Sequence, residues 1–269
     1  MKDFRNKVAV VTGAASGLGK AMALDFARRG MKLALADIEA DALATVEKEI
    51  GVLGVETLVH TTDVSQPSSV LDLAEAVFDR FGGVHILCNN AGVSAGGIKL
   101  VETKLADWEW VLGVNLWGVI HGLNAFLARM IAQGQEAHIV NTASILGMVV
   151  AWPGTAAYVA SKFAVVGLSE ALALELEGTG IGVSVLCPGS VDTHIYESAR
   201  NRPARLKVDR PAIDLRARMK AVSRSWITPE EVSAKVMDAI ESKRFYVFTH
   251  PELGTLMDAR FARIRGSGS

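Results

Sequence analysis

The feature that most constrains this chain is a repeated alternation of short apolar runs with helix-compatible stretches. The first run, Val8 to Thr12, leads through a glycine-rich turn into a helical stretch that ends at Arg29, before Gly30. Short apolar runs bounded by turns predict buried strands, and longer stretches with apolar residues every three or four positions predict helices. Strands that alternate with helices predict a parallel sheet, because parallel neighbours need long crossover connections.

The same alternation continues along the rest of the chain. The expected strands are Val8–Thr12, Lys32–Ala36, Glu56–Thr61, His85–Asn89, His138–Thr142, Gly182–Cys187 and Phe245–Phe248. After the helix that ends at Arg29, the expected helices with both ends defined are Asp41–Ile50, Ala106–Ala132 and Tyr158–Glu177. Two more are expected from their N-caps: one begins near Ser65, and one is capped by Thr228 together with Glu231. The pattern therefore predicts an α/β fold with a seven-stranded parallel sheet and helices on both faces.

We expect one domain over residues 1–265, because no linker rich in glycine, proline or serine divides the 269 residues and half of them are hydrophobic. The closing Gly-Ser-Gly-Ser at 266–269 is typical of a cloning tail. One segment, 193–226, breaks the alternation and holds seven arginines and two lysines against three acidic residues. We interpret it as a flap over the functional site.

Charge and composition narrow the classes of partner and location. The 28 basic residues nearly cancel the 29 acidic ones, so no overall field attracts nucleic acid or an anionic membrane, and neither is an expected partner. The uncharged stretch Ile139–Ser161 is long enough to cross a bilayer, but polar residues and glycines interrupt it, and we interpret it as a strand, a loop and a helix start. Cys88 and Cys187, in apolar runs, and a start without a signal peptide favour the cytoplasm.

The turn after the first strand, Thr12-Gly13-x-x-x-Gly17-x-Gly19, is a candidate nucleotide site. Glycines there let the chain turn tightly and bring backbone amides to a pyrophosphate at a helix N-terminus. The spacing differs from the familiar G-x-G-x-x-G, and an ordinary glycine-rich turn is the alternative.

Asp37 follows the second expected strand, where a carboxylate can accept both adenosine ribose hydroxyls of NAD and would repel the 2′-phosphate of NADP. Neither Ser16 nor Ile38 offers a cation for such a phosphate, so the sequence favours NAD. Asp37 alone is equally compatible with a solvated loop acid.

Tyr158 and Lys162 are four residues apart, on one face of an expected helix. A tyrosine with a pKa of about 10 exchanges protons poorly near neutrality. A positive charge ~4 Å away at an effective dielectric of ~20 contributes about 4 kcal/mol, equivalent to roughly three pKa units before desolvation is subtracted. We expect Lys162 to lower the pKa of Tyr158 and make it a usable acid/base, although the spacing alone is also typical of a surface contact.

Taken together, these motifs resemble the short-chain dehydrogenase/reductase family. The residues that carry the resemblance occur in the family's order from Phe4 to Phe248: the glycine turn, Asp63-Val64, Asn89-Asn90-Ala91-Gly92, Asn115, Ser144, Tyr158 with Lys162, and Pro188-Gly189. The resemblance implies a Rossmann-type, doubly wound, seven-stranded parallel sheet in a three-layer α/β/α sandwich. It also implies a homotetramer or homodimer.

The resemblance implies four catalytic residues. Tyr158 would be the acid/base, Lys162 its partner and a ligand of the nicotinamide ribose, and Ser144 the holder of the substrate oxygen. Asn115 would anchor a water that relays protons. The cofactor-binding residues implied are Gly13, Ser16, Gly17, Leu18, Gly19, Asp37, Ile38, Asp63, Val64, Asn90, Ala91, Gly92, Tyr158, Lys162, Pro188, Gly189, Val191 and Thr193.

The same geometry would surround the substrate with apolar side chains, from Ile145, Leu146, Trp152, Ile195 and Tyr196, which indicates a bulky aromatic or alicyclic alcohol. A weaker resemblance, carried by the opening Met-Lys-Asp-Phe, residues 113–120, 198–204 and 245–252, is to bacterial dehydrogenases that oxidise benzylic alcohols of lignin-derived aryl ethers. The basic flap could steer a carboxylate or phosphate, or its arginines could pair with the body or a neighbouring subunit.

We therefore expect an NAD-dependent oxidoreductase that interconverts a secondary alcohol and a ketone by hydride transfer. The alternatives are an NADP-dependent ketone or 3-oxoacyl reductase and a non-catalytic dinucleotide-binding regulator, although a regulator would not need Asn115, Ser144, Tyr158 and Lys162 together. No metal is expected, because the six histidines show neither ligand spacing nor clustering with cysteines.

Overall fold

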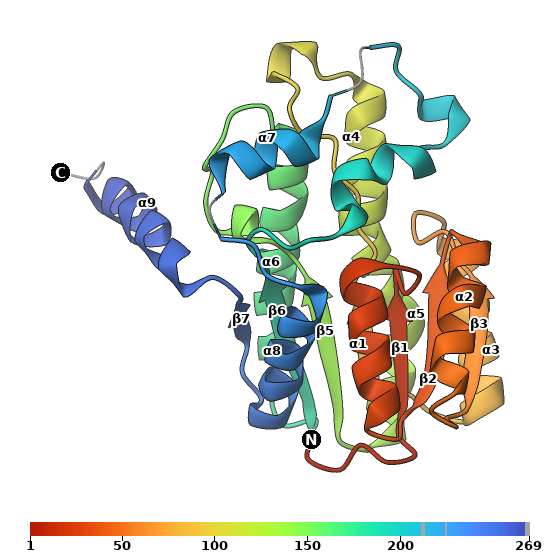
Figure 1. The fold of residues 1–269 in the computed structure, drawn as a ribbon. Coiled ribbons are helices and arrows are strands. Elements are labelled where there is room, and N and C mark those ends of the chain that lie inside the picture. Colours follow the sequence, from red (N-terminus) through yellow and green to blue (C-terminus); the bar gives the residue numbers. More distant parts are fainter. Residues whose placement is uncertain (211–212, 224, 267–269) are drawn as a thin grey trace.

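The computed structural model describes residues 1–210, 213–223 and 225–266, and contains one sheet at its centre (Figure 1). All its strands are parallel, in the order β3-β2-β1-β4-β5-β6-β7. The strands are β1 (Val8–Thr12), β2 (Lys32–Asp37), β3 (Thr57–Thr61), β4 (Ile86–Asn89), β5 (Ala137–Thr142), β6 (Ile181–Cys187) and β7 (Tyr246–Phe248). The order reverses between β1 and β4, and ligands of such sheets bind at this point, beyond the carboxyl ends of the strands.

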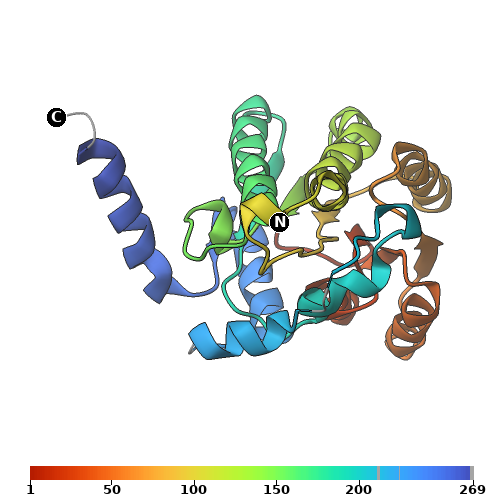
Figure 2. The same ribbon diagram turned by 90° about the horizontal axis from the view of Figure 1, so that it is seen from above.

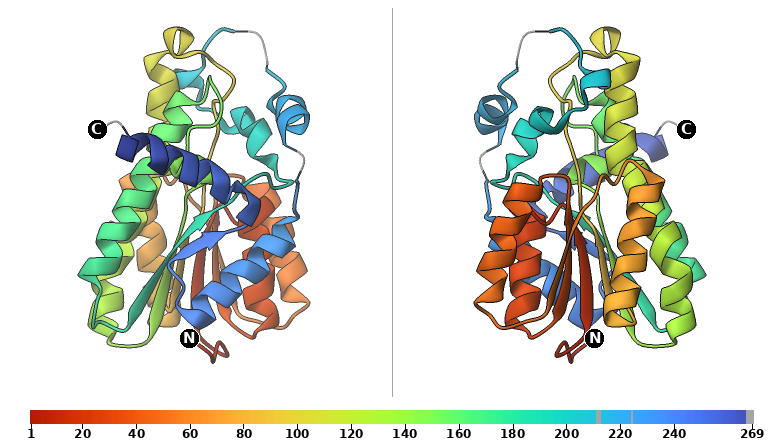
Figure 3. Two further views of the ribbon diagram at one scale, coloured as in Figure 1. Left: turned by 90° about the vertical axis from the view of Figure 1, so that its left-hand side faces the viewer. Right: turned by 90° about the vertical axis from the view of Figure 1, so that its right-hand side faces the viewer.

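Helices cover both faces of the sheet (Figures 2 and 3). One face carries α1 (Gly17–Arg28), α2 (Ala40–Gly51) and α8 (Pro229–Ser242). The other carries α3 (Pro67–Phe81), α4 (Leu105–Leu112), α5 (Gly118–Gln133) and α6 (Ala156–Glu175). Each face has its own core, around Phe26 and Met22 in the first and Phe126 and Val77 in the second. The predicted three-layer Rossmann-type fold is confirmed.

The strands form where the sequence predicts them, with ends shifted by at most one residue. All five residues of β1 are buried, because neighbouring strands lie on both sides of it and helices cover both faces. Such a strand has no solvent side, which explains why its sequence is a continuous apolar run without alternation.

Two predicted helix features differ from the structure. The helix expected over Ala106–Ala132 is interrupted by a five-residue π-helical segment, Gly113–Trp117, between α4 and α5. The N-cap of α3 is Gln66, and Ser65 instead donates its hydroxyl to the Asp63 carboxylate at 2.7 Å. At α8 the predicted cap is confirmed, since the Thr228 hydroxyl accepts from the Glu231 amide at 3.2 Å.

The flap segment 193–226 lies above the carboxyl ends of the strands (Figure 1). Its described residues include two 3-10 turns, His194–Asn201 and Ala204–Leu206, and helix α7 (Leu215–Val222). A last helix, α9 (Gly254–Gly266), which the sequence pattern does not predict, projects from the body beyond β7. The expected tail lies outside the described residues, apart from Gly266.

Two helical stretches, Leu105–Gln133 and Ala156–Glu175, are long and apolar enough to cross a membrane. Both lie along one face of the sheet, and core helices commonly have such a composition. The uncharged stretch Ile139–Ser161 is strand β5, a loop and the start of α6, as interpreted from the sequence.

Candidate active site

A cavity of about 990 Å³ opens at the carboxyl ends of the strands, at the upper end of the usual range for ligand pockets. Its wall is formed by the glycine turn, the ends of β2, β4, β5 and β6, and the flap. All the catalytic and cofactor-binding residues that the sequence suggests line it except Gly19 and Asn115, which lie behind its wall. The structure therefore brings the suggested residues together at one site.

The glycine turn packs so closely that side chains would not fit. Gly13 and Gly17 have positive φ angles of +68° and +51°, a region that favours glycine. A Cβ at Gly13 would lie 2.9 Å from the Cα of Ala91, and one at Gly19 would lie 2.0 Å from the Gly13 carbonyl oxygen. These contacts hold the backbone of the turn against the floor of the cavity, at the N-terminus of α1.

Asn90 ties the end of β1 to the end of β4. Its side-chain amide donates to the Thr12 carbonyl at 2.9 Å, and its backbone amide donates to the Thr12 hydroxyl at 2.9 Å. The same hydroxyl accepts from the Ala91 amide at 3.1 Å. Asn90 thus fixes the shape of the floor that it lines.

The Asp37 carboxylate lies at the end of β2, beside the glycine turn. It accepts hydrogen bonds from the Ala15 amide at 2.9 Å and the Glu39 amide at 3.0 Å. Burial raises the pKa of Asp37, and these backbone hydrogen bonds oppose the rise. The carboxylate is therefore held rigidly against the cavity and is not a freely solvated loop acid.

Tyr158, Lys162 and Ser144 meet at the ends of β5 and α6. The Lys162 Nζ lies 5.7 Å from the centroid of the Tyr158 ring and donates to the Thr142 carbonyl at 2.8 Å. The Ser144 hydroxyl oxygen accepts from the Leu146 amide at 3.1 Å. This contact fixes the Ser144 side chain, which is also hydrogen-bonded to the Tyr158 phenol.

The pKa values of the pair differ from the expectation. Burial raises the pKa of Tyr158 to about 12, despite the opposing hydrogen bond with Ser144, and burial lowers the pKa of Lys162 to about 8. The predicted lowering of the Tyr158 pKa by Lys162 is wrong for this structure. The reason is that desolvation dominates at both groups, and the ammonium donates to Thr142 at the end of β5.

Asn115 lies in the π-helical segment and is fully buried. Its carbonyl oxygen accepts from the Val93 amide at 2.8 Å, and its amide nitrogen donates to the Val93 carbonyl at 3.0 Å and to the Ser161 hydroxyl at 3.1 Å. Asn115 therefore fastens the loop after β4 to α6. A polar residue in the middle of an apolar helix was the only sequence signal of this, and a π segment often marks a functional site.

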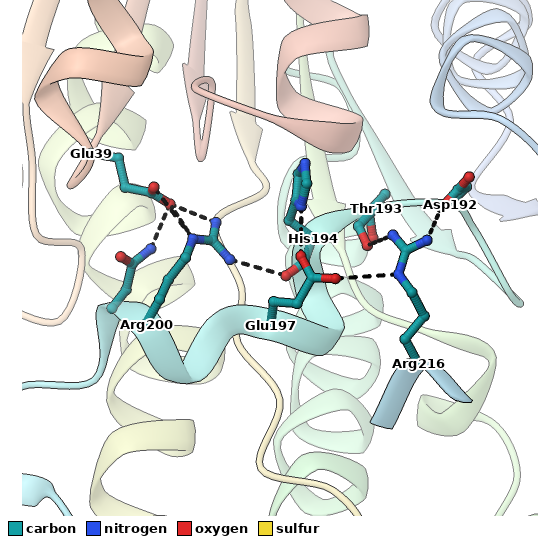
Figure 4. A network of polar contacts seen from close by, with 8 residues as sticks. Glu39, Asp192, Thr193, His194, Glu197, Arg200 and Arg216 are labelled. Carbon is teal, nitrogen blue, oxygen red and sulfur yellow. Dashed lines mark hydrogen bonds and ion pairs between the residues drawn. The ribbon is translucent and has the colours of Figure 1, made fainter. Parts of the chain in front are cut away.

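Ion pairs hold the flap to the rim of the cavity (Figure 4). The Arg200 Nη2 lies 2.6 Å from the Glu39 carboxylate, which also accepts from the Asn201 side chain at 2.6 Å. The Arg216 Nη1 lies 2.6 Å from the Asp192 carboxylate. Glu39 was not among the suggested site residues, since nothing in the sequence pairs it with a segment 160 positions away.

A second anchor of the flap is buried under it. The fully buried Asp107 carboxylate, on α4, pairs with Arg202 at 2.7 Å and with Arg210. Burial raises the pKa of Asp107, but hydrogen bonds from Arg210, the Lys104 amide and Arg202 outweigh it and leave the pKa below its usual value. Flap arginines thus pair with the body, one of the two alternatives left open by the sequence.

The remaining expectations concern the substrate end and metals. All five side chains expected to form an apolar wall line the cavity: Ile145, Leu146, Trp152, Ile195 and Tyr196. Within the part of the chain that the structure describes, no three His, Cys, Asp or Glu side chains are grouped to hold a metal ion. Cys88 and Cys187 are both buried as free thiols.

Comparison with known proteins identifies the family. The sequence profile of the short chain dehydrogenases matches residues 7–204, which include the glycine turn, Ser144, Tyr158 and Lys162. The chain belongs to the short-chain dehydrogenase family. It is therefore an oxidoreductase of a family that binds a nicotinamide dinucleotide.

Three similar proteins span nearly the whole chain. A short-chain dehydrogenase/reductase from Burkholderia phymatum, solved in complex with NAD, is 41% identical with a TM-score of 0.94, and the match covers 99% of this chain and 97% of that one. A CLA biosynthesis dehydrogenase/reductase from Lactiplantibacillus plantarum is 38% identical over 100% of this chain and 96% of that protein. A C alpha-dehydrogenase from Sphingobium sp. is 33% identical over 98% and 87%. The last match confirms the weaker resemblance that the sequence suggested.

The geometry fits a nicotinamide dinucleotide. The glycine turn presents backbone without side chains, Asp37 provides a carboxylate fixed beside it, and Tyr158 and Lys162 line the same cavity. These three features suit the pyrophosphate, the adenosine ribose and the nicotinamide ribose of a dinucleotide, respectively.

Proposed function

We propose that this short-chain dehydrogenase is NAD-dependent and interconverts a bulky secondary alcohol and the corresponding ketone, with Tyr158 as acid/base. The observation that carries the proposal is a single cavity with the Asp37 carboxylate and glycine turn in one part and Tyr158, Ser144 and Lys162 in another. A dinucleotide that occupies the first part would present its nicotinamide to a substrate held in the second.

The chain's own residues orient the substrate and handle its proton. NAD, held by the glycine turn and Asp37, would supply the acceptor for the hydride of the alcohol carbon. Ser144 and Tyr158 bind the substrate oxygen, and the Tyr158 phenol takes the hydroxyl proton in oxidation or gives it back in reduction. A Tyr158 pKa of about 12 favours the protonated form, which donates in reduction. Lys162, with a pKa of about 8, is mostly charged near neutrality and can pass a proton onward at a slightly higher pH.

Asn115 positions the helical turn that carries Lys162. Because its amide binds Ser161, one residue before Lys162 on α6, it holds that turn of the helix in place. We infer that a proton leaves Lys162 through a water near Asn115, as the family resemblance implies.

The preference for NAD rests on Asp37. Its two oxygens already accept backbone amides and retain further lone pairs for ribose hydroxyls, whereas a 2′-phosphate would meet a negative charge. The NAD complex of the Burkholderia phymatum protein supports this assignment. An NADP-dependent reductase is the alternative.

The preference for an apolar substrate rests on the wall of the cavity. Trp152, Leu146 and Tyr196 line it, and such surfaces favour aromatic or alicyclic groups over sugars. The similarity to the C alpha-dehydrogenase from Sphingobium sp. supports a dehydrogenase reaction.

Replacing the Tyr158 phenol tests the catalytic assignment. NAD reduction is followed by absorbance against a panel of benzylic, alicyclic, steroidal, hydroxyacyl and polyol secondary alcohols. We expect activity with benzylic or alicyclic members, and Tyr158→Phe to lower it at least about a hundredfold while NAD affinity stays unchanged, because one hydroxyl is removed. Tyr246→Phe, which removes a phenol that binds Glu170 outside the site, is the control. Retained turnover in Tyr158→Phe would contradict the assignment.

A further inference from the structure

Most of the flap's positive charge is neutralised by carboxylates of the body and of the flap itself. Each of five flap arginines faces at least one carboxylate: Arg200 faces Glu39, Arg202 and Arg210 face Asp107, Arg205 faces Glu109, and Arg216 faces Asp192 and Glu197. In Figure 4, the Arg200 guanidinium contacts Glu39 and the His194 carbonyl. The Arg216 guanidinium contacts Asp192, the Thr193 carbonyl and Glu197. These five therefore serve to hold the flap in place.

Arg218 is different. It lies on α7 and lines the cavity, and among the residues that the structure describes it has no carboxylate partner. Its Nη1 donates only to the Gly97 carbonyl, at 3.2 Å. Gly97 has a φ of +81°, and a Cβ there would lie 2.9 Å from that same nitrogen, so the guanidinium lies directly on the glycine backbone.

The position of Arg218 is at the substrate end of the cavity. Gly97 contacts Gly154, since the Ile98 amide donates to the Gly154 carbonyl at 3.2 Å. Gly154 lies in the loop that leads into α6 and so to Tyr158. Arg218 is therefore next to the loop that leads to the catalytic tyrosine.

The surface beside this cation is apolar, because the side chains of Ile213 and Leu215 pack on the same glycine, Gly97. Leu146, Trp152 and Met219 line the same cavity. Glu252 also lines the cavity but makes no ion pair with Arg218. A single planar guanidinium at the rim of an apolar cavity suits the two oxygens of one carboxylate, whereas a phosphate dianion would require more donors.

We propose that Arg218 binds a carboxylate on the substrate, at the far end of an apolar body whose other end carries the alcohol. This inference rests on the proposed function, because it concerns the same cavity. In the open site water screens the exposed guanidinium, and a substrate that fills the apolar cavity displaces that water and strengthens the pair. The enzyme would then act on amphipathic hydroxy acids or oxo acids.

The test compares acids with their uncharged esters. The substrates are benzylic secondary alcohols whose ring carries, opposite the alcohol, a straight carboxylic acid chain of two, four or six carbons, each beside its methyl ester. We expect kcat/KM to favour the acid over its ester by about tenfold to a hundredfold at the best length, as for hydrogen bonds between charged groups. Added salt should reduce the preference, because it screens the pair.

Two variants on α7 separate a specific site from general charge. Arg218→Ala should abolish the preference for the acid and leave kcat/KM for the ester within about twofold of the wild type. Lys220→Ala removes the same charge from the same helix, two residues away and outside the cavity wall, and should keep the preference. Equal use of acid and ester by the wild type, or an unchanged preference in Arg218→Ala, would overturn the proposal.

A binding measurement keeps this inference separate from the proposed reaction. Trp152 lines the cavity, so titration of 6-phenylhexanoate and of its methyl ester, which carry no alcohol, can be followed by tryptophan fluorescence without turnover. Tighter binding of the acid that is lost in Arg218→Ala supports the carboxylate site even if no alcohol is oxidised, in which case the proposed function alone has failed. Binding that is the same, or absent, for both compounds overturns the carboxylate site.

Discussion

At the scale of the residue, burial controls the protonation of the catalytic pair more strongly than the distance between its members. Lys162 is almost fully buried and its ammonium has one protein acceptor, the Thr142 carbonyl. Its charged form is therefore penalised, and the pKa falls to about 8. A lysine with such a pKa can gain and lose a proton near the working pH, which suits a relay better than a permanently charged side chain does.

This shift makes a prediction about stability and pH. Between about pH 8 and the usual lysine pKa of 10.5, the unfolded chain holds a proton on Lys162 that the folded chain has released. The contribution of Lys162 to the free energy of unfolding should therefore rise with pH in this window, by at most about 1.4 kcal/mol per pH unit. Burial also raises the pKa of the Cys88 and Cys187 thiols, which lowers the free energy of unfolding of any variant over the same range. Urea denaturation at about pH 7.5, 8.5 and 9.5 should therefore show a difference between the wild type and Lys162→Met that grows in favour of the wild type as the pH rises. Parallel curves for the two proteins would contradict a lowered pKa.

Asp37 carries a prediction about cofactor choice. In Asp37→Ser the ribose hydroxyls lose a charged acceptor and the 2′-phosphate loses a repelling charge. We expect NAD affinity to fall about tenfold to a hundredfold and the ratio of NAD to NADP affinity to fall with it. Asp41→Asn, which removes an exposed carboxylate in the first turn of α2, is the control. Cofactor titrations check this, and comparable wild-type affinity for both cofactors would disprove the role of Asp37.

At the scale of the element, the flap is held by ion pairs of two kinds, and α4 offers one of each. Asp107 is fully buried and pairs with two arginines, whereas Glu109 is exposed and pairs with Arg205. Removal of one partner of a buried pair leaves an unpaired buried charge, which costs about 3–5 kcal/mol, while exposed pairs contribute about 0–1 kcal/mol. The two kinds of contact therefore stabilise the flap to very different degrees.

Matched substitutions on α4 test this difference. Asp107→Asn should loosen the flap and increase the rate of limited trypsin cleavage at its arginines at least about tenfold, while Glu109→Gln should leave cleavage within about twofold of the wild type. Because the pKa of Asp107 is lowered, its contribution is complete at neutral pH and is lost only as the pH falls below the usual value of 3.8. Equal cleavage of the two variants would show that the buried anchor does not hold the flap.

At the scale of the whole molecule, helices α5 and α6 each expose a large apolar side chain. Leu174 on α6 is 70% exposed and Ile131 on α5 is 45% exposed. Burial of such side chains against a second copy would remove apolar surface from water. We propose that the chain forms a homotetramer through these helices.

The mass in solution tests this proposal. Sedimentation of the wild type should give about four times the 28.7 kDa of one chain. Leu174→Lys should shift the mass to smaller species, because it places a charge in the interface. Leu71→Lys, on α3 and also exposed, should not. A monomer in the wild type would contradict the proposal.

Much of this molecule follows from local sequence. The seven strands could be predicted to within one residue at each end, because buried parallel strands need continuous apolar runs and their glycine turns and helix caps depend on neighbouring residues. The glycine turn, Asp37, Ser144, Tyr158 and Lys162 were also identifiable, since their spacing along the chain is a property of the sequence.

Other features depended on contacts between distant segments and could be seen only in the folded chain. Within the π segment, the Asn115 side chain binds Val93 and Ser161. The flap is held by Glu39 and Asp107, each about a hundred positions or more from its arginines. Burial in the assembled site, not spacing, set the pKa values of Tyr158 and Lys162. The sequence by itself determined which elements form and which residues can do the chemistry. Only the tertiary structure decided which charges are paired and which, like Arg218, remain available, because pairing and desolvation depend on distances in space.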